Sequence, residues 1–211
     1  MRIAIIGAGN VGGTLGRRWA ALGHEVVFGV RRPAEGATAV KGGGALPAGA
    51  SVATPREAVR GADAVLLATP WGAVPATLAE LGPLLEGVVL LDATNPLGPG
   101  LALEAGPGGQ SGGEQVQAMA PHARVVKVFN TTGYDNMRDP VYAGAPTVMF
   151  YAGDDAGAMT VAATLASALG FEAVNAGPLT RARQLEHLAV LWISLAFGGL
   201  GRDIAFRLVR R

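Results

Sequence analysis

The first residues whose spacing predicts chemistry are the glycines of Gly7-Ala8-Gly9-Asn10-Val11-Gly12. They form a complete GxGxxG, which follows a short apolar run, Ile3 to Ile6, and opens a segment with helical spacing. In this context the first glycine permits a tight turn, the second lets the backbone approach a pyrophosphate, and the third lets helix and strand pack closely. The free amides at the start of a helix favour phosphate groups. The motif therefore predicts a dinucleotide site that includes Asn10 and Val11, although a packing turn without a ligand is the alternative.

Two arginines follow the second expected strand, where a dinucleotide-binding domain usually carries an acidic residue for the adenosine ribose. The strand ends in Phe28-Gly29-Val30-Arg31-Arg32 and offers no such acid. Because guanidinium groups bind phosphate oxygens in a bidentate manner, Arg31 and Arg32 predict a 2'-phosphate and therefore NADP(H). Two exposed arginines without a ligand are the alternative. Lys41 would add a third charge only if its loop folds over the site.

Small polar residues end three later strands, in Thr69-Pro70-Trp71, Thr94-Asn95-Pro96 and Phe129-Asn130-Thr131. Ligands of open parallel sheets bind at the carboxyl ends of the strands, so we expect these segments to face the nicotinamide. The candidates for positioning the reacting rings are Thr69, Pro70, Asn95, Asn130 and Thr131. Trp71 and Pro96 are further candidates for cofactor contacts.

None of these segments supplies an acid or a base, and each ionisable candidate elsewhere has a structural explanation. His24 and His122 lie in expected turns, and His187 lies in the last helix, either as a surface or interface residue or as a ligand contact. Lys127 falls inside a strand, where a charge must be paired, so we expect a structural ion pair. The chain has no cysteine and its three histidines lack ligand spacing, so no metal site is expected.

Composition excludes several classes of protein. The net charge of +1 gives no electrostatic reason to expect nucleic acid as a partner. No secretory signal is evident, and the longest apolar stretch, Leu188 to Gly201, is shorter than the roughly 20 residues of a membrane-spanning helix. We therefore expect a cytoplasmic protein that does not enter the membrane.

Apolar runs and helical spacing alternate along the chain, which predicts a parallel sheet covered by helices. The fold class is α/β, a Rossmann-type doubly wound sheet with a small C-terminal helical part. Residues 1–175 are expected to form the dinucleotide-binding domain and 176–211 the helical segment. The expected strands are 3–6, 25–30, 51–53, 64–68, 88–91, 125–129, 147–151 and 171–174. The expected helices are 11–22, with Val11, Leu15, Trp19 and Leu22 on one side, 55–60, 71–85, 114–120 and, broken near its glycines, 180–211. A further helix, capped by Asp154 or Asp155, is expected to run to about Leu169.

The segment from Leu188 to Phe197 carries more apolar surface than a small domain leaves in water. It predicts an interface in a homodimer, in which Gly199 to Asp203 turn back toward the active site. Packing on its own Rossmann core is the alternative.

Motifs along the whole chain resemble the NADP oxidoreductases that act with coenzyme F420, an 8-hydroxy-5-deazaflavin. Besides the glycine turn, they are Gly29-Val30-Arg31, Ala68-Thr69-Pro70-Trp71, Asn95-Pro96-Leu97, Val126-Lys127-Val128-Phe129-Asn130-Thr131, Gly153-Asp154-Asp155, Ala176-Gly177-Pro178-Leu179 and Gly199-Leu200-Gly201-Arg202-Asp203. The NADP-binding domain of the six-transmembrane metalloreductases is similar over the same motifs.

The resemblance implies NADP(H) binding and hydride exchange with coenzyme F420 or with a flavin, FAD or FMN. Two positions depart from the family pattern: Asn130 stands where the archaeal enzymes carry histidine, and Val30 stands where serine is common. Two other functions stay open. One is an imine or β-hydroxyacid reductase on the same fold, and the other is an NADP(H)-sensing module without catalysis.

Overall fold

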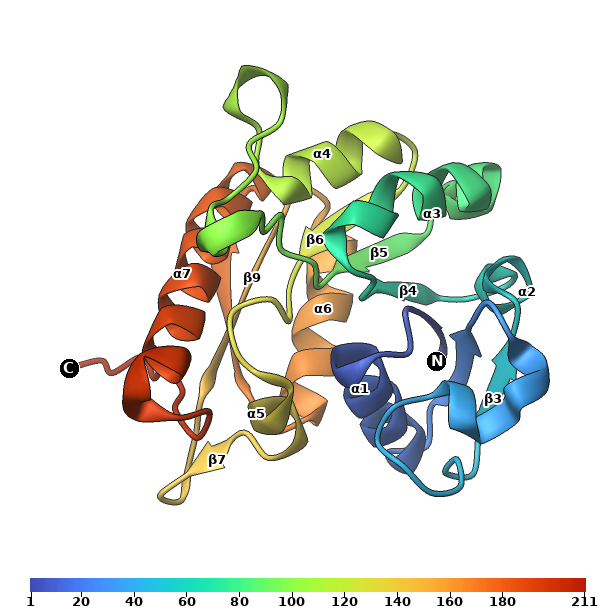
Figure 1. The fold of residues 1–211 in the computed structure, drawn as a ribbon, viewed down its shortest axis with the longest axis horizontal. Coiled ribbons are helices and arrows are strands. Elements are labelled where there is room, and N and C mark those ends of the chain that lie inside the picture. Colours follow the sequence, from blue (N-terminus) through green and yellow to red (C-terminus); the bar gives the residue numbers. More distant parts are fainter.

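A central sheet organises the chain, which the computed structural model describes over residues 1–211 (Figure 1). Its strands are β1 (Arg2–Ile6), β2 (Glu25–Gly29), β3 (Ala50–Ala53), β4 (Ala64–Leu67), β5 (Val89–Asp92), β6 (Arg124–Lys127), β9 (Val148–Gly153) and β10 (Glu172–Gly177). Their order in space is β10-β9-β6-β5-β4-β1-β2-β3. All neighbours are parallel except β6 and β9. The chain thus winds outward from β1 in both directions, and the expected doubly wound fold is confirmed.

Successive strand residues face opposite sides of the sheet, so the sheet has two cores. Ile3 and Ile5 belong to one apolar cluster, and Ala4 and Ile6 to the other. Helices α1 (Asn10–Ala21), α5 (Tyr134–Arg138) and α6 (Ala156–Ala168) cover the first face. Helices α2 (Pro55–Val59), α3 (Val74–Leu81) and α4 (Gly112–Met119) cover the second, and α7 (Ala182–Leu195) packs beside α4.

The single helix expected over 71–85 is wrong in detail. The structure has a 3-10 turn at Trp71–Ala73, then α3, then a second 3-10 turn at Gly82–Leu85. Gly82 has φ +40°, which ends α3 because this backbone conformation cannot continue a helix. Leu22 was also expected on the buried side of α1, but it is half exposed, because it ends the helix before the turn at Gly23.

The helical expectation for 180–211 holds only as far as Leu200. Helix α7 continues into a π-helical turn, Ala196–Leu200, and the chain beyond it is not helical. Gly199 and Gly201 have φ of +121° and +74°, which no right-handed helix accommodates. The tail instead follows the sheet, since the amide of Val148 donates to the carbonyl of Phe206 at 3.0 Å. Whether residues 176–211 form a separate domain stays a prediction.

A short hairpin, β7 (Val141–Tyr142) and β8 (Ala145–Pro146), precedes β9. No helix in the structure combines the length and the apolar character that a membrane crossing requires.

Candidate functional site

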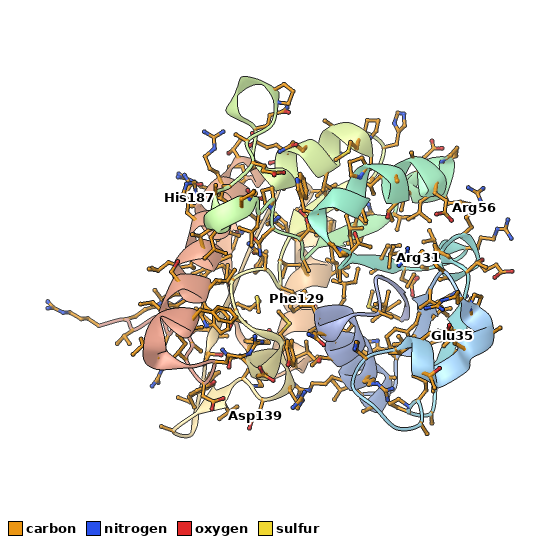
Figure 2. The ribbon with its side chains drawn as sticks, viewed as in Figure 1. Arg31, Glu35, Arg56, Phe129, Asp139 and His187 are labelled. Carbon is orange, nitrogen blue, oxygen red and sulfur yellow. The ribbon has the colours of Figure 1, made fainter.

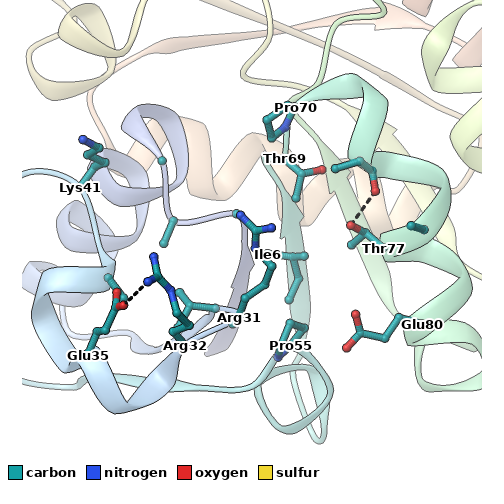
Figure 3. Close-up of a pocket in the computed structure, with 18 residues that line it drawn as sticks. Ile6, Arg31, Arg32, Glu35, Lys41, Pro55, Thr69, Pro70, Thr77 and Glu80 are labelled. Carbon is teal, nitrogen blue, oxygen red and sulfur yellow. Dashed lines mark hydrogen bonds and ion pairs between the residues drawn. The ribbon is translucent and has the colours of Figure 1, made fainter.

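A cavity of about 570 Å³ opens beside the carboxyl ends of β1 and β4, where the winding of the sheet reverses (Figure 3). Crevices at this point of open α/β sheets are the usual place for a ligand. Several of the expected cofactor residues line the cavity: Gly7, Gly9, Arg31, Arg32, Thr69 and Pro70. Lys41 lines it as well. The cavity therefore joins the glycine turn, the paired arginines and the end of β4.

The glycine turn forms the floor of this cavity, and two of its positions require glycine. Gly7 has φ +99°, and a Cβ there would lie 2.6 Å from the backbone carbonyl of Ala68. A Cβ on Gly12 would lie 2.0 Å from the carbonyl oxygen of Gly7. These contacts bring β1, β4 and α1 into close approach, as the motif predicts.

Gly9 differs from the other two because a Cβ there would meet no atom within 4 Å. Its open face lies at the start of α1, where no side chain caps the helix and the first turn has no acidic residue. First-turn amides without a capping group and a positive helix end suit a phosphate group. The residues present thus fit the dinucleotide that the motif predicts.

The two adjacent arginines both line the cavity, but only one of them has an acidic partner. Arg32 forms an ion pair with Glu35 at 2.8 Å (Figure 3). Arg31 has no carboxylate partner, so its guanidinium is free for an anion in the cavity. Glu80 lies on the opposite wall, on α3 (Figure 3).

The ends of β5 and β6 are joined by two asparagine side chains. The amide nitrogen of Asn95 donates to the backbone carbonyl of Asn130, and that of Asn130 donates to Oδ1 of Asn95, both at 3.0 Å. Two buried polar atoms beyond the ends of β4 and β6 have no partner in the protein, Oγ1 of Thr69 and Oδ1 of Asn130. Because buried polar atoms are nearly always hydrogen-bonded, these two are candidates for contacts with a ligand.

Phe129 turns the chain at the end of β6 toward this site. Its φ is +61°, a conformation that costs a residue other than glycine about 1–2 kcal/mol. Packing compensates for the strain, since the ring is buried edge-on against Trp19 with 5.5 Å between centroids. Figure 2 shows Phe129 between the part of the chain that holds Arg31 and the helix that carries His187. Strain of this kind often accompanies functional sites, and no sequence pattern indicates it.

The other expected site residues, Asn95 and Asn130 included, do not line the cavity. Asn10, Val11 and Gly12 form the first turn of α1. Trp71 packs against the core of the second face, and Thr131 is buried near Met149. Pro96 is buried beside Gly112, where an added Cβ would lie 2.9 Å from its ring. Any contact of these residues with a cofactor stays a prediction.

Lys127 is fully buried and paired, as expected. Its ammonium lies 2.9 Å from Asp92, 2.9 Å from Glu186 and 2.6 Å from the carbonyl of Thr94. Burial acts to lower the pKa of Lys127, but the charges of Asp92 and Glu186 outweigh it, so the pKa is raised and the ammonium is charged at neutral pH. Glu186 also accepts from the amides of Gly112 and Gly113 at 3.0 Å, which connects α7 to the start of α4.

The histidines lie away from the cavity. His187 is exposed on α7, on the opposite side of Figure 2 from Arg31, and its Nδ1 contacts the carbonyl of Arg183. His122 is exposed in the turn before β6, and His24 lies in the turn before β2, as expected. No group of three or more histidine, aspartate or glutamate side chains could hold a metal ion.

Comparison with known proteins agrees with this geometry. Residues 2–96 match the model of the family described as NADP oxidoreductase, coenzyme F420-dependent. A crystal structure from Arthrobacter sp. FB24, described as that of an F420-dependent NADP reductase, is 33% identical, with a TM-score of 0.85 and all of both chains covered. The chain belongs to the F420-dependent NADP oxidoreductase family. The fold and the dinucleotide turn are thus those of an NADP-dependent oxidoreductase.

Two curated relatives show how far the similarity extends along the chain. The F420-dependent NADP reductase of Methanothermobacter thermautotrophicus is 28% identical over 99% of this chain and 94% of its own length. Metalloreductase STEAP3 of Rattus norvegicus is 28% identical over 88% of this chain but only 36% of its own length. The chain therefore spans about a third of the metalloreductase.

Proposed function

We propose that this family member transfers a hydride between NADP(H) and a tricyclic ring, coenzyme F420 or a flavin. When bound, the two cofactors supply the hydride donor and its acceptor. The observation that carries the proposal is the pairing of Asn95 with Asn130 beyond β5 and β6, where Oδ1 of Asn130 has no partner. The ionisable side chains that end these two strands, Asp92 and Lys127, are buried and paired with each other. Transfer between two such cofactors needs positioned rings more than it needs an acid or a base.

The nucleotide half of the cavity supports binding of NADP(H). The amides at the start of α1 bind the pyrophosphate beside the open face of Gly9. Arg31 and Arg32 bind the 2'-phosphate, Arg32 with Glu35 as its partner in the free protein. The hydrogen-bonded pair of Asn95 and Asn130 holds the reacting end, with Oγ1 of Thr69 and Oδ1 of Asn130 as free contacts for the rings.

Lys127 is the candidate proton donor for a conventional reductase, and its contacts argue against this role. A lysine ammonium has three N–H groups, and Asp92, Glu186 and the carbonyl of Thr94 engage all three. The side chain is inaccessible to solvent. An imine or β-hydroxyacid reductase would need another donor, and Asp92, the other ionisable side chain at the ends of β5 and β6, is buried and already paired with Lys127.

The acceptor itself is the decisive test of this function. NADPH oxidation is measured by rapid mixing with coenzyme F420, FMN, FAD, a cyclic imine and a β-keto acid, each at saturation. We expect fast oxidation with at least one tricyclic acceptor and none with the imine or the keto acid. Turnover of either of these two alone would overturn the proposal. Binding of NADPH without turnover of any acceptor would instead support the sensing module.

Removing the Arg31 side chain is expected to change cofactor preference. A charge-assisted contact to phosphate contributes about 1.5–3 kcal/mol, so Arg31→Ala should weaken NADPH binding by roughly ten- to a hundred-fold. NADH binding should barely change. Calorimetric titration of both cofactors measures this, with Arg60→Ala, an exposed arginine outside the cavity, as the control. Equal weakening of the two cofactors would contradict the assignment.

We also expect the protein to form a homodimer through its C-terminal helix. Leu191, Leu195, Phe197 and Leu200 are large apolar side chains exposed on α7 and the π-helical turn that follows it, Phe197 by 74%. We expect a dimer in light scattering at micromolar concentration, and a monomer for Phe197→Asp. Leu22→Asp changes an exposed leucine directly after α1 and should stay dimeric. A wild-type monomer would exclude this interface.

The cytoplasmic location of the protein stays a prediction.

A further inference from the structure

Residues 40–46, the Lys41 loop, lie against the first turns of α1 and reach the cavity. Val40 anchors the loop, because it is 3% exposed and belongs to the apolar core of that face. The amide of Lys41 donates to the carbonyl of Ala8, within the glycine turn, at 2.9 Å. The loop is thus bonded to the same segment that forms the floor of the cavity.

One side chain of α1 holds the rest of the loop. The Arg17 guanidinium donates to three successive parts of it, the carbonyls of Lys41 at 3.2 Å, Ala45 at 2.8 Å and Gly44 at 3.4 Å. Arg17 has no carboxylate partner, so its charge is engaged by these carbonyls alone. It therefore acts as a clamp on the backbone that carries Lys41.

Gly13 permits the loop to lie this close to the helix. A Cβ at this position would lie 2.5 Å from the carbonyl oxygen of Lys41, closer than a side chain and a backbone atom can approach. Gly13 and Arg17 are four residues apart on α1 and so lie on the same face of the helix. Gly13 is outside the GxGxxG pattern, and the contact with the loop explains why this position is glycine.

The Lys41 side chain lines the cavity together with Gly9, Arg31 and Arg32 (Figure 3). It is exposed and has no carboxylate partner. Glu35, an acid that also lines the cavity, is paired with Arg32. This wall of the cavity therefore carries two cations without partners, Arg31 and Lys41, in addition to the paired Arg32. An anionic ligand would neutralise this excess of positive charge.

We propose that Lys41 is the third cation for the 2'-phosphate of the dinucleotide, and that Arg17 and Gly13 are its positioning residues. The inference rests on the proposed function only in its choice of NADP(H). Arg17 acts through the loop, so its effect on affinity should depend on the presence of the Lys41 side chain. A lysine that is merely solvated would leave phosphate affinity independent of Arg17.

Fragment binding tests this inference without any hydride acceptor. Calorimetry measures the affinity of the intact protein for 2',5'-ADP and for 5'-AMP, which differ only in the 2'-phosphate. Lys41→Met should weaken 2',5'-ADP by about tenfold and leave 5'-AMP unchanged. Arg17→Met should weaken 2',5'-ADP by several-fold, and it should add nothing to Lys41→Met in the double variant. Arg60→Met is the control with the same change of charge.

A second readout separates positioning from loss of charge. Hydrogen exchange of the amide of Lys41, which is bonded to Ala8, should become faster in Arg17→Met and in Gly13→Ala but not in Lys41→Met. If 2',5'-ADP binds the wild type better than 5'-AMP but Lys41→Met changes neither, this inference fails and the proposed cofactor stands. If the wild type does not distinguish the two fragments, the proposed NADP(H) preference fails with it.

Discussion

Replacing Gly12 with alanine is expected to weaken NADPH binding by at least about a hundred-fold and to lower the free energy of unfolding by roughly 1–3 kcal/mol. The new Cβ would lie 2.0 Å from the carbonyl oxygen of Gly7, so β1 and α1 must move apart. The movement displaces the amides that bind the pyrophosphate, and each lost contact to a charged group is worth about 1.5–3 kcal/mol. Calorimetric titration and urea unfolding measure the two effects.

Variants at two other glycines distinguish a clash within the protein from a clash with the bound dinucleotide. A Cβ on Gly9 meets no protein atom, so Gly9→Ala should fold with unchanged stability and still weaken NADPH, because the methyl group occupies the space of the ligand. Gly198→Ala adds a methyl group in open space at a residue that does not line the cavity and should leave NADPH affinity unchanged. Wild-type affinity in Gly12→Ala, or full affinity in Gly9→Ala, would contradict the placement of the dinucleotide on this turn.

Replacing Lys127 with methionine is expected to destabilise the protein by about 3–5 kcal/mol, because Asp92 and Glu186 are left as uncompensated buried charges. Thermal unfolding should shift down by roughly 6–20 °C for a domain of this size. Since the pKa of Lys127 is raised in the folded protein, its contribution is complete below the unfolded value of about 10.4 and declines only as pH rises through the folded value.

The control for Lys127→Met is Arg210→Met, which removes an exposed ion pair with Glu172 and should cost less than about 1 kcal/mol. The single-turnover rate of hydride transfer should stay within about tenfold of wild type in folded Lys127→Met, whereas loss of a general acid would slow it by about 10²–10⁴-fold. A loss of that size, with stability unchanged, would identify Lys127 as catalytic.

Much of the fold follows from local patterns. The apolar run 3–6, the glycine turn and the helix after it predict β1 and α1 because each local signal agrees with the doubly wound sheet. The boundary of α7 could not be predicted in the same way. Its glycines indicate a break, but the path of the tail beyond it depends on long-range bonds such as that from Val148 to Phe206.

The candidate site divides in the same way between local and long-range information. The glycines and the paired arginines carry their chemistry in sequence, and the structure brings both to one cavity. The clamp of Arg17 on the Lys41 loop has no local signal, since it depends on where a glycine-rich loop folds. The pairing of Asn95 with Asn130 and the left-handed turn at Phe129 likewise depend on contacts between distant strand ends.

The central claim is that the hydride passes directly from nicotinamide to a tricyclic ring. The most direct measurement is a single turnover of NADPH carrying deuterium at the transferred position, with coenzyme F420 as acceptor and mass analysis of the reduced product. We predict that the label appears on the ring carbon of the deazaflavin, with a primary isotope effect on the fast phase, and that Asn130→Leu slows this phase by misplacing the rings. Product without deuterium, or label found only in a carbonyl or imine substrate, would contradict the account.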